Sequence, residues 1–259
     1  MQKPQDVAEN EKVMMTEAER LVTEAKKRGL HLRLLGAMAF QAHCPKYRYL
    51  TTKLGRMLSD IDFAAYRKEG SKISKMMKEL GYVDNPVVTT MFGHMRMIWD
   101  NSSNGQHVDI FYDKLQMNHD IPFNNRLELE ESTIPLADML LEKMQIVHIN
   151  EKDVIDVIMF LREHALGHAA PEIIDTAYVK ALLSGDWGFC YTVTENLKKF
   201  HDRLPSFGEL TEEDRADVSS KIQALLKIIE DEPKTLGWRM RAKVGTKNKW
   251  YRQVEELSR

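Results

Sequence analysis

The chain has 259 residues, of which 37 are Lys or Arg and 39 are Asp or Glu, giving a formal net charge of −2. This balance excludes bulk electrostatic attraction to nucleic acid, and two cysteines are too few for a disulfide framework. No apolar stretch is long enough to span a membrane and the N-terminal residues lack an apolar signal core, so the sequence predicts a cytoplasmic protein that does not engage a membrane.

The first predicted elements are a helix, a strand and a second, shorter helix. Helical periodicity covers about 7–28, and residues 31–35 are typical of a strand that ends at Gly36. Residues 37–44 predict a short helix that stops before Pro45. A glycine between a strand and a helix lets the backbone approach a phosphate closely, so this turn is a candidate phosphate site.

The next predicted strand carries an Asp-x-Asp pair. Asp60 and Asp62 lie in the segment Leu-Ser-Asp-Ile-Asp-Phe, whose apolar and β-branched residues favour a strand. Side chains two positions apart share one face of a strand, so we expect both carboxylates on one face and Ile61 and Phe63 on the other.

A third aspartate follows in a predicted hairpin. A helix capped by Ser71 and closed by Gly81 is expected first. Residues 95–99 and 107–111 then predict paired strands joined by a polar turn, and the second strand contains Asp109.

Three carboxylates gathered in one small volume predict a cation site. The like charges raise each other's pKa unless a cation neutralises them. Oxygen ligands on a rigid sheet suit Mg²⁺, with Mn²⁺ as the alternative ion. Two such ions about 3.5–4 Å apart hold both the nucleophile and the leaving group in polymerase-like sites. The competing interpretation is a set of solvated aspartates at strand edges, and the glycine turn upstream favours the catalytic one.

In this order the motifs resemble those of the nucleotidyltransferase superfamily, which has the polymerase-β-like fold. The resemblance is greatest to AbiEii-toxin-like and antibiotic-nucleotidyltransferase-like proteins. The family's Gly-Gly or Gly-Ser turn corresponds to Gly36 and Ala37, its Asp-x-Asp to Asp60 and Asp62, and its third carboxylate to Asp109. The resemblance implies an α+β fold, with a mixed β-sheet flanked by helices and then an α-helical C-terminal domain.

The resemblance also implies an activity and its partners. Such an enzyme moves a nucleoside monophosphate from a nucleoside triphosphate, such as ATP, to an acceptor, with Mg²⁺ held by the three aspartates. The acceptor is a small molecule such as an antibiotic, a protein side chain or a tRNA end, and a toxin-type enzyme would have an antitoxin partner. Ala37 lacks the hydroxyl that serine offers to a phosphate, so the alternative is a catalytically weak binding protein with the same fold.

Three further residues are candidate nucleotide ligands through the same resemblance, namely Ser59, Lys143 and Lys152. The AbiEii-like branch carries a lysine followed by a Lys-Asp-x-x-Asp segment, which corresponds here to Lys143 and to 152–156. The alternatives are a solvated lysine on an amphipathic helix for Lys143, and an ordinary i,i+4 ion pair with Asp156 for Lys152.

From Pro135 onward the pattern is helical throughout, which predicts an α/β domain over 1–132 and a helical domain over 133–259. The expected helices cover 136–149, 151–165, 171–183, 188–201 and 211–231. His164 and His168 are four residues apart, but Gly167 between them weakens a shared helix, so end-of-helix histidines are preferred to a metal site.

The segment from Pro233 to Gln253 has seven basic residues and no acidic one, with Trp238, Trp250 and Tyr251 interleaved. Such a segment can follow a phosphate backbone and stack on bases. Alternatively it can dock, either over the acidic catalytic cleft or on the helical domain. Docking is the preferred interpretation, because two tryptophans can bury a large area.

Overall fold

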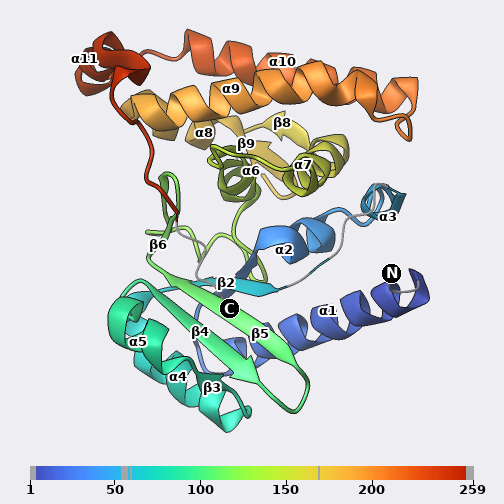
Figure 1. Ribbon diagram of the computed structural model, residues 1–259, viewed down its shortest axis with the longest axis vertical. Helices are drawn as coiled ribbons and strands as arrows, with labels where there is room; N and C mark the ends of the chain where they lie inside the picture. Colours follow the sequence, from blue (N-terminus) through green and yellow to red (C-terminus); the bar gives the residue numbers. More distant parts are fainter. Residues whose placement is uncertain (1–3, 54–57, 59, 169, 255–259) are drawn as a thin grey trace. The chain divides into compact units, whose positions relative to one another are not determined.

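The computed structural model describes residues 4–53, 58, 60–168 and 170–254 (Figure 1). These residues form two compact units. The first comprises the described residues within Met1–Ala42, Met57–Gln116 and Ile121–Pro135, and the second those within His43–Arg56, Met117–Asp120 and Leu136–Arg259. The units interleave along the sequence, and the predicted division into two continuous domains at residue 132 stays a prediction.

The first unit is built on a five-stranded mixed sheet with the strand order β1-β2-β5-β4-β3. In that order the strands are Leu32–Leu35, Ile61–Ala65, Gln106–Tyr112, Arg96–Asn101 and Val83–Asp84. β2 and β5 are parallel, and the other neighbouring pairs are antiparallel. The sheet and its helices confirm the mixed α+β class, and β4 and β5 confirm the predicted hairpin.

The sheet has one apolar face and one face that carries charge. The apolar face is formed by alternate residues of the three central strands, all nearly inaccessible to solvent: Ile61, Phe63, Met97, Trp99, Val108 and Ile110. Figure 1 shows α1 and α4 on one side of the sheet and α2 on the other. Because side chains alternate along a strand, Asp62 points to the face opposite Ile61 and Phe63, as predicted.

Four helices complete the first unit: α1 (Pro4–Lys27), α2 (Gly36–His43), α4 (Gly70–Glu79) and α5 (Pro86–Phe92). α1 packs against β1 and α4, and α5 packs against β4. The prediction that Ser71 caps a helix is wrong, because α4 continues directly from the 3-10 turn Arg67–Glu69 and its N-cap residue Glu69 makes no side-chain capping bond. Gly81 has a left-handed φ of +89°, as expected of the residue that closes this helix.

The second unit is mainly helical. Its main helices are α6 (Leu136–Met144), α7 (Glu151–Glu163), α8 (Thr176–Gly185), α9 (Trp187–Arg203), α10 (Glu212–Asp231) and α11 (Leu236–Val244), with the short α3 (Tyr49–Lys53). Within the described part of the chain, no helix combines the length and the apolar character needed to cross a membrane.

The expectation of a purely helical C-terminal part is wrong at one place. β8 (Ala165–Gly167) and β9 (Ile173–Asp175) pair in parallel, so the predicted helix over 171–183 begins only at Thr176. Two β-branched isoleucines favour the strand, and the Asp175 carboxylate then accepts bonds from the first N–H groups of α8. Before the C-terminal part, a two-stranded sheet pairs β6 (Lys114–Gln116) with β7 (Asp120–Pro122), and β6 and most of β7 belong to the first unit.

The basic C-terminal segment docks on its own unit. The Trp250 indole donates to Thr192 Oγ1 at 3.1 Å and lies edge-on to Tyr191. The Arg252 backbone N–H donates to the Asn118 carbonyl at 3.0 Å, and the Arg252 side chain pairs with Asp120 at 2.9 Å. These contacts support the docking interpretation.

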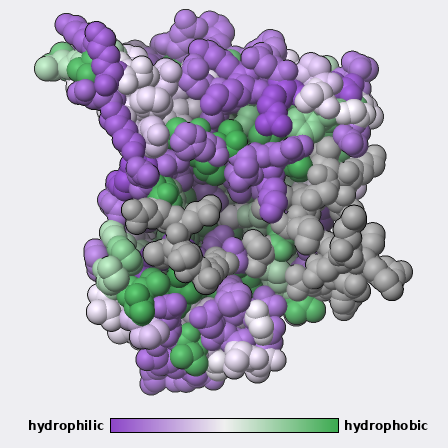
Figure 2. Space-filling view, in the orientation of Figure 1, coloured by the Kyte–Doolittle hydropathy of each residue, from purple (hydrophilic) through white to green (hydrophobic). Residues whose placement is uncertain are grey.

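The helix α11 of this segment keeps an apolar side exposed. Leu236 is 66% exposed and Met240 is 62% exposed, one helical turn apart. In Figure 2 the surface over α11 accordingly shows apolar atoms beside hydrophilic ones. Its other side contacts α8 and α9, where the Arg241 guanidinium lies 4.7 Å from the centre of the Trp187 ring.

Candidate functional site

Two of the three predicted carboxylates lie side by side. Asp62 on β2 and Asp109 on β5 are direct partners in the parallel register. Neighbouring strands are about 4.8 Å apart, and partnered residues point to the same face, so both carboxylates extend from adjacent positions. Asp109 is 4% exposed, whereas Asp62 is half-buried. The register therefore creates a pair of neighbouring carboxylates, one near the start of β2 and one in the middle of β5.

Asp60 directly precedes β2, because the strand begins at Ile61. The prediction that Asp60 lies inside the strand is therefore wrong by one residue, although its side chain is half-buried. Its role as a third ligand stays a prediction. Ser59 lies outside the described residues.

The turn between β1 and α2 brings the backbone against Asp62. Leu35, the last residue of β1, is the register partner of Asp62, and α2 begins at the next residue. Gly36 has a φ of +69°, and a Cβ atom there would lie 2.6 Å from Asp62 Oδ2. Only glycine fits this position, for its backbone angle and for the space. The predicted strand, glycine and helix are thus present, and the N-terminal turn of α2, which favours anions, opens beside the carboxylates.

Arg96 is the charged residue of this face that the sequence analysis missed. It lies on β4, two positions from the register partner of Asp109, and its guanidinium forms an ion pair with the Asp109 carboxylate. The same guanidinium lies 5.0 Å from the centre of the Phe111 ring. The predicted hairpin contained the necessary signal, since Arg96 stands two residues before the position opposite Asp109.

The donor set of this face fits Mg²⁺ or Mn²⁺. Both ions prefer carboxylate oxygens, and Asp62 and Asp109 present such oxygens from adjacent rigid strands. Arg96 already supplies positive charge to Asp109. A cation bound there would therefore share the Asp109 carboxylate with Arg96, or it would displace Arg96 from that carboxylate. This competition lowers the affinity of the site for metal.

Lys143 is buried in the second unit, with only 7% of its side chain exposed. Its ammonium lies 2.9 Å from Asp153 Oδ1 and 3.1 Å from Asp156 Oδ2, both on α7. Burial would lower the pKa of Lys143, but the Asp156 and Asp153 carboxylates outweigh burial and raise it, so the ammonium stays charged. The cluster joins α6 to α7, which is a sufficient structural reason for this lysine.

Lys152 is exposed at the start of α7, and Asp156 pairs with Lys143. The two segments singled out by the resemblance, around Lys143 and over 152–156, thus come together through the buried lysine. Phosphate contacts by Lys143 and Lys152 stay predictions.

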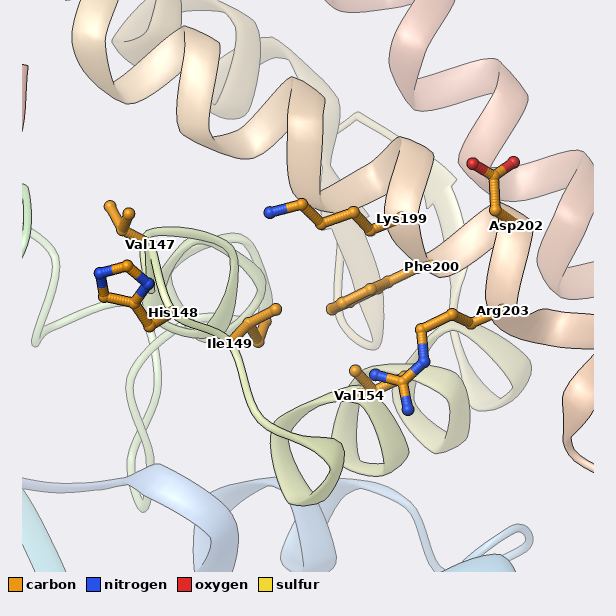
Figure 3. A pocket seen from close by; sticks show the side chains of 8 residues that line it. All are labelled: Val147, His148, Ile149, Val154, Lys199, Phe200, Asp202 and Arg203. Carbon is orange, nitrogen blue, oxygen red and sulfur yellow. The ribbon is translucent and has the colours of Figure 1, made fainter.

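A pocket of about 500 Å³ opens in the second unit between α9 and the residues that precede and begin α7. Its lining residues are Val147, His148, Ile149, Val154, Lys199, Phe200, Asp202 and Arg203. Figure 3 shows the Lys199 side chain reaching toward Val147 and His148, while the Asp202 carboxylate points away from them. This pocket was not predicted, because Lys199 lies on the predicted helix over 188–201 but Arg203 lies beyond the predicted end of that helix.

No protein family model matches the chain, and no curated protein matches it. Among solved structures, the chain is similar to the crystal structure of an antigenic nucleotidyltransferase-like protein from Paracoccidioides brasiliensis. The two share 13% sequence identity, the TM-score is 0.39, and the match covers 86% of this chain and 95% of that one. So low a score and identity assign no activity to this chain, and its function has to be inferred from its own residues.

Proposed function

We propose that the chain is a metal-dependent nucleotidyltransferase that moves a nucleoside monophosphate from a nucleoside triphosphate to an acceptor. The observation that carries this proposal is the adjacency of Asp62 and Asp109 on parallel strands, with the Gly36 turn against Asp62. Paired carboxylates beside a helix N-terminus supply oxygen ligands for a cation and N–H donors for the phosphates that the cation binds.

The aspartates of the sheet face and the start of α2 would have different roles in the reaction. Asp62 and Asp109, together with Asp60, would hold Mg²⁺ or Mn²⁺. When bound, the cation neutralises charge on the triphosphate and favours departure of pyrophosphate. The first N–H groups of α2, at Gly36 and Ala37, would bind phosphate oxygens and orient the triphosphate.

Asp109 has an alternative role in this proposal. Instead of holding a cation, its carboxylate would accept the proton of the acceptor hydroxyl, as a general base, once the acceptor lies within hydrogen-bond distance. Arg96 would hold that carboxylate in position, because an ion pair between two partly buried side chains restricts their rotamers. Lys143 is assigned to the pyrophosphate, and Lys152 to nucleotide binding, only through the resemblance to AbiEii-like proteins.

A second candidate function is nucleotide binding without transfer. The ion pair between Arg96 and Asp109 favours it, because a guanidinium that already neutralises Asp109 weakens the site for a second metal ion. Ala37 favours it as well, since no hydroxyl is present at the turn.

Transfer of label from nucleoside triphosphates labelled at the α-phosphate tests the reaction. The protein is incubated with Mg²⁺, each triphosphate, and three acceptor classes in separate reactions: proteins, tRNA and hydroxylated antibiotics. We expect label on one class, abolished by Asp62→Asn and kept by Asp100→Asn, which removes a carboxylate from a half-exposed position of β4. Undiminished transfer by Asp62→Asn would reject the proposed site, and triphosphate binding without any transfer would support the binding protein.

A separate experiment tests whether the protein is a toxin-type enzyme. Expression of the chain should arrest growth, and the double substitution Asp60→Asn/Asp62→Asn should relieve the arrest. Growth unaffected by the unaltered protein would remove the toxin role and the antitoxin partner, and would leave the transfer activity to be decided by the labelling experiment.

A further inference from the structure

Three potential metal ligands meet in the second unit. His43 ends α2, His164 follows α7, and Glu172 precedes β9. One ligand atom from each can be chosen so that all three lie within 4.8 Å of one another. His168, four residues after His164, is not part of this set, and His164 instead meets residues 121 positions before and 8 positions after it.

Two of the distances between these atoms match the edges of a tetrahedral site. The Glu172 carboxylate lies 3.3 Å from His43 Nδ1 and 3.5 Å from His164 Nδ1. Zn²⁺ binds imidazole nitrogen and carboxylate oxygen at about 2.0–2.2 Å, so tetrahedral geometry separates its ligand atoms by about 3.4 Å. Two of the three edges therefore already have the required length.

The backbone of Glu172 indicates why its side chain reaches both histidines. Its φ is +58°, in the left-handed region that residues other than glycine seldom occupy. In this conformation its carbonyl oxygen also lies 3.2 Å from His164 Nδ1. The side chain is 62% exposed, whereas that of His164 is 2% exposed, so the site has a buried side and a side open to solvent.

The surroundings of His164 are compatible with ligation through Nδ1. Its other ring nitrogen, Nε2, lies 4.0 Å from the buried Cys44 sulfur. A proton carried on Nε2 would point toward that sulfur, which is a weak acceptor, and would leave the Nδ1 lone pair for a metal. Without a metal, Nδ1 can carry the proton and donate it to the Glu172 carbonyl.

We propose that His43, His164 and Glu172 bind a Zn²⁺-class cation, with water in the fourth position. Two imidazoles and one carboxylate favour Zn²⁺ or Co²⁺ over Mg²⁺, which prefers oxygen ligands only. The cation would join three residues of the second unit: His43, His164 at the end of α7, and Glu172 directly before β9. It would therefore hold Glu172 in its left-handed backbone conformation.

Titration with Co²⁺ tests this site with a readout independent of any activity. The full chain is stripped with a chelator, and Co²⁺ is added while visible absorption and thermal unfolding are followed. We expect one equivalent of Co²⁺ with the intense bands of four-coordinate cobalt, and a rise in the melting temperature. Zn²⁺ should displace the Co²⁺ and remove the bands, since it binds the same ligands.

The substitution Glu172→Gln is the main variant, because its exposed carboxylate can be lost without disturbing the core. Removing a ligand should weaken Co²⁺ binding by at least about tenfold, since even outer partners of ligands contribute about 10–100-fold. His164→Gln should do the same, and its melting curve in chelator shows whether it folds. His168→Gln, in the same connection, and Asp62→Asn, in the first unit, should keep the bands.

Two results would overturn the proposal. One is a failure of the unaltered chain to take up Co²⁺ at micromolar concentrations. The other is uptake that survives Glu172→Gln but is lost in Asp62→Asn, which would place the ion on the carboxylates of the sheet.

Discussion

Gly36 and Gly29 form a matched pair that separates backbone strain from steric conflict. Both have a left-handed φ, +69° and +66°, but a Cβ atom at Gly29 would meet nothing within 4 Å. Gly29→Ala should lower the free energy of unfolding by about 1 kcal/mol through strain alone. Gly36→Ala should lower it by about 2–4 kcal/mol, because its Cβ also collides with Asp62. Urea unfolding measures both, and equal losses would contradict the close approach at Asp62.

Lys143 provides the second prediction at this scale. Lys143→Met leaves the buried Asp153 and Asp156 without their cation, so it should lower the free energy of unfolding by about 3–5 kcal/mol. The exposed Lys152 is the matched control, and Lys152→Met should change stability by less than about 0.5 kcal/mol. Chemical denaturation measures both. A Lys143→Met protein of unchanged stability that has lost nucleotide binding would instead make this lysine a phosphate contact.

His119 should make stability depend on pH. Burial lowers the pKa of this imidazole to about 4, although the Asp186 carboxylate opposes the shift. The folded state therefore binds fewer protons than the unfolded state between about pH 4 and pH 6.5, so stability should fall as the pH falls through this window. Each unit of displacement corresponds to about 1.4 kcal/mol.

Thermal unfolding at several pH values measures this dependence. His119→Gln keeps a polar group near Thr192, the hydrogen-bond partner of the imidazole, and should flatten the slope. His148→Gln is the control, because that side chain is exposed and stays in water in both states. An unchanged slope in His119→Gln would assign the acid sensitivity to other groups.

At the scale of elements, the contacts of the C-terminal segment predict that it stabilises the second unit. A chain that ends at Glu232 loses the bonds of Trp250 and Arg252, so its melting temperature should fall. Trp250→Ala should lower the free energy of unfolding by about 1–3 kcal/mol, because the ring is partly buried. Met240→Ala, at an exposed position of α11, should change it by less than about 0.5 kcal/mol.

Calorimetry of the shortened chain and of both variants tests this role of the segment. An unchanged melting curve of the shortened chain, together with loss of RNA binding, would contradict docking and would make a tRNA-like acceptor the leading candidate.

Local patterns predicted most elements of the fold. The hairpin of β4 and β5 followed from alternation, and the start of α2 followed from a glycine after an apolar strand. The pair β8 and β9 was missed because strands of three residues are too short for a periodic signal, and helical residues surround them. The false cap at Ser71 shows a related limit, since a serine near a helix start is favourable whether or not it forms the capping bond.

At the scale of the whole molecule, contacts between distant segments explain what the sequence could not predict. Alternation placed Asp62 on one face, but its neighbour Asp109 depends on parallel pairing of strands 47 residues apart. The ion pair of Arg96 depends on the register of β4, and the His43–His164–Glu172 cluster on three segments with no shared periodicity. The residue types in the sequence could suggest a site built on carboxylates. Which side chains lie next to one another follows only from the strand register and from the packing of distant segments.

The central claim is that Asp62 and Asp109 together hold a cation that binds a triphosphate. Calorimetric titration of nucleoside triphosphates into the protein tests this claim most directly. Each triphosphate is titrated in Mg²⁺ and again in chelator, into the unaltered chain and into Asp62→Asn, Asp109→Asn and the control Asp100→Asn. The expected result is Mg²⁺-dependent binding of at least one triphosphate that is lost in the first two variants and kept in the control. Binding of equal strength in chelator, or in Asp62→Asn, would contradict the account.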